Sequence, residues 1–137
     1  MKTYNSFILS LGLLILLNTI LLGQEVAFVS SADNTDAIEK NLVAGVETDN
    51  LGLKVSSAYY LGERKSSRAV LPLMNILHTD KNEEARIMAA VSLYKIGSEK
   101  GIYAVKRAAE YNDSESVRRL CKIFYNMYLK AQINGEE

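Results

Sequence analysis

One helical pattern occurs three times in this chain at a constant spacing of 32 residues, and this period constrains the fold more than any other sequence feature. Lys54, Arg86 and Arg118 fall in register, and an apolar residue precedes each of them. The further matches at this offset are Ala58 with Ala90, Leu61 with Leu93, Ser66 with Ser98, Val70 with Ile102, Leu73 with Val105, Asp80 with Asn112 and Glu83 with Glu115. A fixed period of this length is typical of similar units stacked side by side.

Each unit contains two apolar stripes with helical spacing. In the first unit, Val55, Ala58 and Leu61 lie on one side of a helix of about three turns. A second stripe, with spacing i, i+3, i+4 and i+7, begins at Val70, and Pro72 predicts a slight bend or a late start in that helix. A helix that begins near residue 36 covers the open edge of this unit. The helices after it are predicted at about 51–63, 67–78, 83–95, 100–111 and 114–130.

The links between units carry signals for helix ends. Asp80 with Glu83, and Asn112 with Glu115, have the three-residue spacing of an N-cap and its reciprocal carboxylate. We therefore expect each pair to open the helix that follows it. Gly97 suits a helix C-cap, where a positive φ is needed.

The pattern of the second unit resembles a known family. Residues 85–97 contain an arginine, a run of alanines, a leucine and a closing Ile-Gly. They resemble the first helix of a HEAT repeat of the short bacterial type, also found in phycobilisome-lyase-like proteins. Residues 61–63 and 69–73 are similar to the end of the first helix and to the second helix of the same repeat. The resemblance covers about residues 37–128 and implies an all-α fold, a short right-handed α-solenoid (a HEAT-like α-α superhelix) of about 2.5–3 helix pairs.

The chain departs from the family pattern at several positions. Tyr94 and Lys65 stand where the family usually has glycine, and the third unit has bulky residues, Leu120, Ile123 and Phe124, in place of alanines. This last difference suggests a terminal unit that caps the stack.

The N-terminal segment has the pattern of an export signal. A positive start at Lys2 is followed by residues 7–22, which are almost wholly apolar. This run is closer to a signal-peptide core than to a membrane span, so we interpret residues 1–23 as a signal peptide. Cleavage after Ala27 or Ala32 is also compatible with the pattern. The alternative is an uncleaved inner-membrane anchor formed by residues 7–22.

The remaining domain organisation follows from polarity and periodicity. We expect a flexible leader over residues 24–36, a HEAT-like repeat domain over residues 37–130 and a disordered tail over residues 131–137. The expected localisation is periplasmic or secreted in a bacterium.

The charge balance argues against nucleic-acid binding. Removal of residues 1–23 lowers the number of basic residues from 16 to 15 against 16 acidic ones. A nearly neutral chain has little attraction for phosphates, so no nucleic-acid partner is expected.

No residues form a convincing catalytic set. His78, the only histidine, lacks a nucleophile or metal-ligand partner and fits a solvated helix end. Cys121 cannot form an internal disulfide and fits a small buried side chain on an apolar stripe. Paired-histidine metal spacing, a glycine-rich phosphate loop and a serine elbow are all missing from the sequence. We predict no catalytic, metal-binding or cofactor-binding residues, no cofactor and no enzymatic activity.

The resemblance also implies roles for two sets of polar residues. The basic residues of the first helices, Lys54, Arg86 and Arg118, are expected to reach an acidic or amide partner in an adjoining link, with ligand binding as the alternative. The second helices of such repeats line the concave side of the solenoid. The candidate partner-binding residues there are Arg68, Asn75, Lys100, Tyr103, Arg107 and Tyr111. Tyrosine and arginine are common interface anchors, and an ordinary solvated helix face is the alternative.

The predicted function is a non-enzymatic protein–protein interaction or scaffold module that is exported and binds a protein or peptide through the solenoid surface. One alternative is an enzyme accessory or lyase-like HEAT protein. Another is a membrane-anchored subunit of an envelope complex, which requires that the N-terminal segment remains uncleaved.

Overall fold

The computed structural model describes residues 34–135 of the chain. The predicted signal peptide and the leader up to residue 33 lie outside the described residues, as do residues 136–137. The chain divides into two compact units, residues 1–38 and residues 39–137. In the first unit only residues 34–38 are described, and they are helical.

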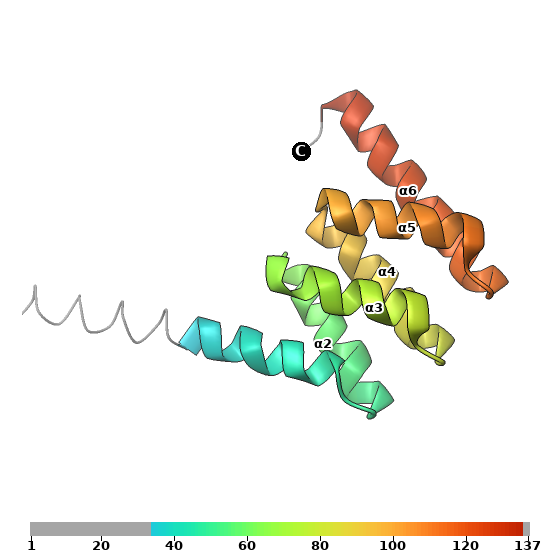
Figure 1. The fold of residues 1–137 in the computed structure, drawn as a ribbon. Coiled ribbons are helices and arrows are strands. Elements are labelled where there is room, and N and C mark those ends of the chain that lie inside the picture. Colours follow the sequence, from blue (N-terminus) through green and yellow to red (C-terminus); the bar gives the residue numbers. More distant parts are fainter. Residues whose placement is uncertain (1–33, 136–137) are drawn as a thin grey trace, which may run out of the picture. The chain divides into compact units, whose positions relative to one another are not determined.

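The described residues form helices joined by short links, and no strand occurs between residues 34 and 135. A helix over residues 34–46 comes first. The elements after it are α2 (Leu51–Glu63), the short 3₁₀ helix η1 (Ser67–Ala69), α3 (Val70–Thr79), α4 (Glu83–Ile96), α5 (Glu99–Tyr111) and α6 (Glu115–Asn134). The first helices of the units, α2, α4 and α6, pack in one layer, and the second helices, α3 and α5, pack in another (Figure 1). The predicted fold class, a short all-α solenoid, is confirmed.

Two helix boundaries in the structure differ from the predicted ones, namely the start of the first helix and the end of α6. Residues 34–36, assigned to the leader, belong to the first helix, whose polar first turn carries no apolar periodicity. Polar side chains suit that position because the first N–H groups of a helix lack intrahelical partners. Residues 131–134, assigned to the tail, belong to α6, which ends only where Gly135 adopts a φ of 70°. A left-handed glycine is a strong helix stop, and no comparable stop precedes it.

The three links that precede α2, α4 and α6 contain the same type of turn. Side-chain oxygens of Thr48, Asp80 and Asn112 accept hydrogen bonds from the backbone N–H two residues later, at 3.3, 2.8 and 3.1 Å. The residues that donate these bonds are the N-caps of α2, α4 and α6. The prediction that Asp80 and Asn112 are themselves N-caps is therefore wrong. Each lies two residues upstream, where an Asp or Asn side chain stabilises a local turn and fixes the cap that follows.

Gly97 and Pro72 behave as the sequence predicts, and the structure adds a left-handed Lys65. Gly97 ends α4 with a φ of 71°, and Lys65 takes the corresponding left-handed conformation after α2, with a φ of 49°. Pro72 lies in the first turn of α3, where its missing N–H would have no intrahelical partner in any case. The 3₁₀ helix η1 before this turn is the late helix start that Pro72 predicts.

A continuous apolar core runs through the unit of residues 39–137. Its large side chains that are at most 2% exposed are Val46, Leu61, Leu73, Leu77, Leu93, Val105 and Val117. They come from the first helix and from α2 to α6, so each helix pair completes the core of its neighbour.

The α2–α4 and α4–α6 contacts are packed differently at equivalent positions, with small residues in the first and aromatic rings in the second. Between α2 and α4, a Cβ added to Gly62 would lie 2.9 Å from the Ser92 Cα, and the Ser92 hydroxyl donates to the Ala58 carbonyl at 2.7 Å. Thirty-two residues later, Tyr94 and Phe124 occupy the positions of Gly62 and Ser92. Their rings stack between α4 and α6 with centroids 5.6 Å apart. The two departures from the family pattern therefore compensate each other.

The capping role predicted for the third unit is only partly realised. Phe124 packs against the core, but Ile123 is 46% exposed on α6, and Met127 is exposed to the same extent. The bulky residues of α6 thus serve the contact with α4 on one side and remain at the surface on the other.

We predict that Gly62→Ala lowers the free energy of unfolding by about 1–2 kcal/mol, because the close approach of α4 leaves no room for a methyl group. This loss exceeds the gain in helix propensity that alanine usually gives. Gly52→Ala is the matched control, because its added Cβ would meet only the Asn50 side chain at 3.6 Å. Urea unfolding of the two variants measures the difference. Equal or greater stability of Gly62→Ala would contradict the close α2–α4 packing.

We predict that Cys121 does not react with thiol reagents in the folded protein. Its side chain is fully buried, and burial raises its pKa to about 12. Because the thiolate is the reactive form, modification at pH 8 should be at least about 100-fold slower than in urea. The reaction with an aromatic disulfide reagent measures both rates, and the denatured sample serves as the positive control. Rapid modification of the native protein would show that Cys121 is accessible.

Candidate functional site

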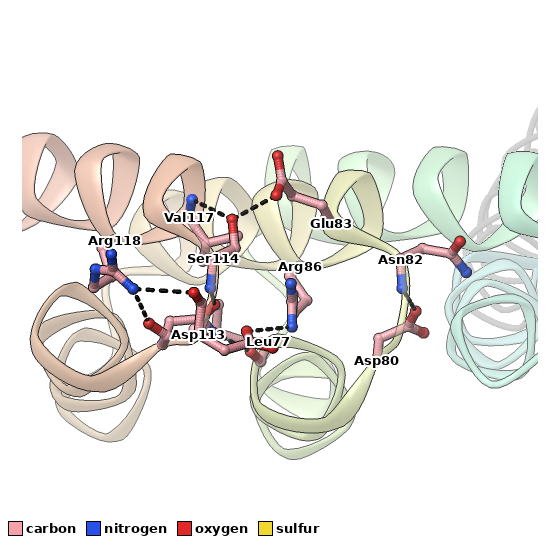
Figure 2. Close-up of polar contacts among 10 residues, drawn as sticks. Leu77, Asp80, Asn82, Glu83, Arg86, Asp113, Ser114, Val117 and Arg118 are labelled. Carbon is pink, nitrogen blue, oxygen red and sulfur yellow. Dashed lines mark hydrogen bonds and ion pairs between the residues drawn. The ribbon is translucent and has the colours of Figure 1, made fainter.

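The basic residues of the first helices contact the links, as the family resemblance implies, and Figure 2 shows this for Arg86 and Arg118. The Lys54 ammonium donates to the Asp80 carboxylate in the link between α3 and α4, and both side chains are largely buried, at 14% and 8% exposed. Arg86 Nη1 donates to Asp113 Oδ1 at 2.7 Å in the link between α5 and α6. Each of these bonds connects one unit to the link of the next.

The acidic partner of the basic residue differs between the first and second units because the residue at the register position of Asp80 is uncharged in the next link. Asn112 occupies the register position of Asp80 but is neutral, so Arg86 pairs with the adjacent Asp113 instead. The Asn112 amide donates to the Leu77 carbonyl at the end of α3, at 3.3 Å. No further link follows α6 among the described residues, and Arg118 turns to the carbonyls of Asn112 and Asp113 in its own link, at 2.6 and 3.1 Å.

The electrostatics of Asp80 follow from this position. Burial raises the pKa of its carboxyl group, but the hydrogen bonds from Lys54 and from the Asn82 N–H, together with the Lys54 charge, outweigh that effect. The pKa of Asp80 therefore lies below its ordinary value of 3.8, and the group is ionised at neutral pH.

A groove of about 930 Å³ lies between α3 and α5, and the two links and one first helix close it at one end. This volume is in the range of pockets that bind small molecules or short peptide segments. The lining residues are Leu71, Met74, Asn75, Leu77, His78 and Thr79 from α3; Asp80 and Lys81 from its link; Arg86 from α4; Ala104, Arg107, Ala108 and Tyr111 from α5; and Asn112 and Asp113 from the last link.

The groove brings together three of the six predicted partner-binding residues. Asn75 lies on the α3 wall, and Arg107 and Tyr111 lie on the α5 wall. The Arg107 guanidinium covers the Tyr111 ring at 4.3 Å from its centroid. A cation held over an aromatic ring in this way forms a flat, semi-rigid contact surface.

The other three predicted residues do not line the groove. Arg68 lies in η1 and forms an ion pair with Glu39 across 3.3 Å, so its charge already serves the contact with the first helix. Lys100 and Tyr103 are exposed on α5, where Tyr103 is 62% exposed.

Sequence reasoning missed most of the lining because a helical wheel selects one outward direction on each helix. The groove instead uses facing sides of two neighbouring helices, namely Leu71, Met74 and His78 of α3 opposite Ala104 and Ala108 of α5. Which sides face each other depends on how α3 and α5 pack. The 32-residue spacing was the available signal for lining residues outside the second helices, since Asp80, Arg86 and Asn112 all recur at it.

Between residues 34 and 135, no group of three His, Cys, Asp or Glu side chains could hold a metal ion. In the same range, none of the helices has the length and apolar character needed to cross a bilayer.

A family model for HEAT repeats matches residues 39–122. This span covers more than half of the 137 residues and includes both walls of the groove. No curated protein matches the chain in sequence.

We predict that Asp80→Asn lowers the free energy of unfolding by about 3 kcal/mol at pH 7, because it leaves the largely buried Lys54 ammonium without a counter-charge. The solvent-accessible pair of Lys95 and Glu63 provides the control, and Glu63→Gln should have a much smaller effect because water screens this pair. Thermal and urea unfolding measure both. Equal effects of the two substitutions would contradict the assigned importance of the buried pair.

The advantage of the wild-type protein over Asp80→Asn should also depend on pH. Since the folded-state pKa of Asp80 is lowered, its stabilisation is present above the ordinary value of 3.8 and is lost as the pH falls through the folded-state pKa. Unfolding measurements from pH 7 toward about pH 2 should show the difference between the two proteins shrinking at the acid end. A difference that stays constant over this range would refute the assignment.

Proposed function

The chain belongs to the HEAT-repeat family, whose members generally serve as scaffolds for protein–protein interaction, and from this premise we propose that it is an exported, non-enzymatic module that binds a peptide segment of a protein partner. The binding site in this proposal is the groove between α3 and α5. The observation that carries it is the convergence of Asn75, Arg107 and Tyr111 on this groove.

Three properties of the groove support a peptide ligand. The groove is open to solvent and lies between α3 and α5, so an extended segment can enter it. Its walls combine an exposed leucine, Leu71, with the stacked pair of Arg107 and Tyr111. Interfaces are enriched in tyrosine and arginine because such side chains provide large contact area and several hydrogen bonds.

Export is part of this proposal and rests on the apolar run at residues 7–22. A positive start followed by an apolar run of this length is typical of secretory signals. N-terminal sequencing of the protein purified from the cell envelope tests it. A mature chain that begins at Gln24, or after Ala27 or Ala32, is expected, and a chain that retains residues 1–23 would favour the anchored alternative.

The binding site is tested with the double variant Arg107→Ala/Tyr111→Ala. Crosslinked pull-down from the cell envelope should lose the partner recovered with the wild-type protein. The free energy of unfolding should change by less than about 1 kcal/mol, because both side chains are exposed and their mutual contact is weak. Recovery of the same partner in equal amount would refute the groove as the site.

Two control variants sharpen this result. Tyr60→Ala/Arg64→Ala removes an exposed tyrosine of α2 and the exposed arginine at its C-cap, four residues apart and outside the groove. It should leave capture unchanged. Lys100→Ala/Tyr103→Ala removes the predicted residues of α5 that do not line the groove. Its capture should also stay unchanged if the groove, rather than the wider strip of α5, binds the partner.

A further inference from the structure

The charged groups that line the groove do not balance. Lys81, Arg86 and Arg107 are positive, and Asp80 and Asp113 are negative. Asp80 is already paired with Lys54, which lies outside the lining. One carboxylate, Asp113, is therefore left against three cations, and the groove carries a local excess of positive charge in a chain whose formal net charge is zero.

Arg86 contributes strongly to this excess because its charge is largely buried and weakly balanced. Its side chain is 11% exposed, while that of its partner Asp113 is 81% exposed and hydrated. The buried Nε of Arg86 has no hydrogen-bond partner. A charge in such a low-dielectric position acts over a longer range than one in water, so it raises the potential in the groove.

Arg107 has the geometry to contact an anion directly. It is exposed, and no carboxylate pairs with it among the described residues. Its flat face lies over the Tyr111 ring, which leaves the N–H groups at the edge of the guanidinium for a ligand. A planar carboxylate can accept two parallel hydrogen bonds from such an edge.

An apolar surface lies on the opposite wall. Leu71 is 67% exposed and Met74 is partly buried, both on α3, and the small side chains of Ala104 and Ala108 keep the space between the helices open. Burial of an apolar ligand side chain here would remove exposed leucine and methionine surface from water.

We propose that the groove recognises an extended acidic peptide, with one Asp or Glu side chain on Arg107 and a neighbouring apolar side chain against Leu71 and Met74. This inference rests on the proposed function and specifies the chemistry of its partner. A nucleic acid fits less well, because a chain with a formal net charge of zero has little attraction for a run of phosphates.

The test uses an array of synthetic peptides that differ at two positions in a glycine-serine background. One position carries Asp, Asn or Lys, and a second position, two or three residues away, carries Leu or Ser. Protein purified from the cell envelope is titrated into each fluorescently labelled peptide, and binding is measured by fluorescence anisotropy at low and high salt. The variants compared with the wild type are Arg107→Gln and, as the matched control, Lys100→Gln, which removes an exposed cation of the same helix outside the groove.

The wild type and Lys100→Gln should bind the peptide with Asp and Leu about tenfold more tightly than the peptide with Asn and Leu. This preference should weaken at high salt, because it is electrostatic. Arg107→Gln should reduce it to less than about twofold. Replacement of Leu by Ser should weaken binding to all three proteins.

Other outcomes separate the two proposals. Binding without preference for Asp, or a preference that survives Arg107→Gln, overturns the acidic specificity and leaves the groove as a peptide site. A preference for the Lys peptide overturns the charge argument. Failure of every peptide to bind, together with unchanged partner capture by Arg107→Ala/Tyr111→Ala, overturns both the specificity and the groove.

Discussion

None of the helices α2 to α6 can keep its apolar side out of water without the helices beside it, and the other features of the repeat domain depend on this constraint. The core side chains of α2, α4 and α6 form one seam because each first helix contacts the next. The seam tolerates two different spacings. Gly62 and Ser92 bring α2 and α4 together closely, while Tyr94 and Phe124 fill the same positions between α4 and α6 with stacked rings. Close packing requires only that the two sides of a contact change together.

The polar links serve this seam. Asp80 fixes the turn before α4 through its hydrogen bond with the Asn82 N–H and at the same time holds the Lys54 ammonium of the preceding first helix. Arg86 and Asp113 repeat the second of these contacts one unit later. The pair of Lys54 and Asp80 is largely buried on both sides, and such a pair adds little net stability compared with an apolar pair, but its loss leaves an uncompensated charge. These pairs therefore hold each link in one position relative to its neighbour.

The same links close the end of the groove between α3 and α5, which connects the architecture to the proposed function. Arg86 takes part in both, because it lines the groove and anchors the last link through Asp113. Two successive second helices are needed to form the walls. A single repeat would present Asn75 or Arg107 on an ordinary solvated helix face, without a groove between them.

The sequence by itself determined the repeat, the all-α class and most helix boundaries, because apolar periodicity and the 32-residue register are local properties of the chain. It also placed Asn75, Arg107 and Tyr111 at outward positions, which can be read from a helical wheel, but it placed Arg68, Lys100 and Tyr103 there as well. It assigned the wrong role to Asp80 and Asn112, because an N-cap and an Asx turn two residues upstream use the same residue types. It ended α6 too early, since the apolar period fades before Gly135 stops the helix.

Only the tertiary structure decided which sides of α3 and α5 face each other, and therefore that Leu71, Met74 and Arg86 join the groove while Lys100 and Tyr103 stay outside it. It alone paired Tyr94 with Phe124. Contacts between helices depend on their separation and crossing, which are set by the combined packing of many side chains. No single stretch of the sequence contains that information.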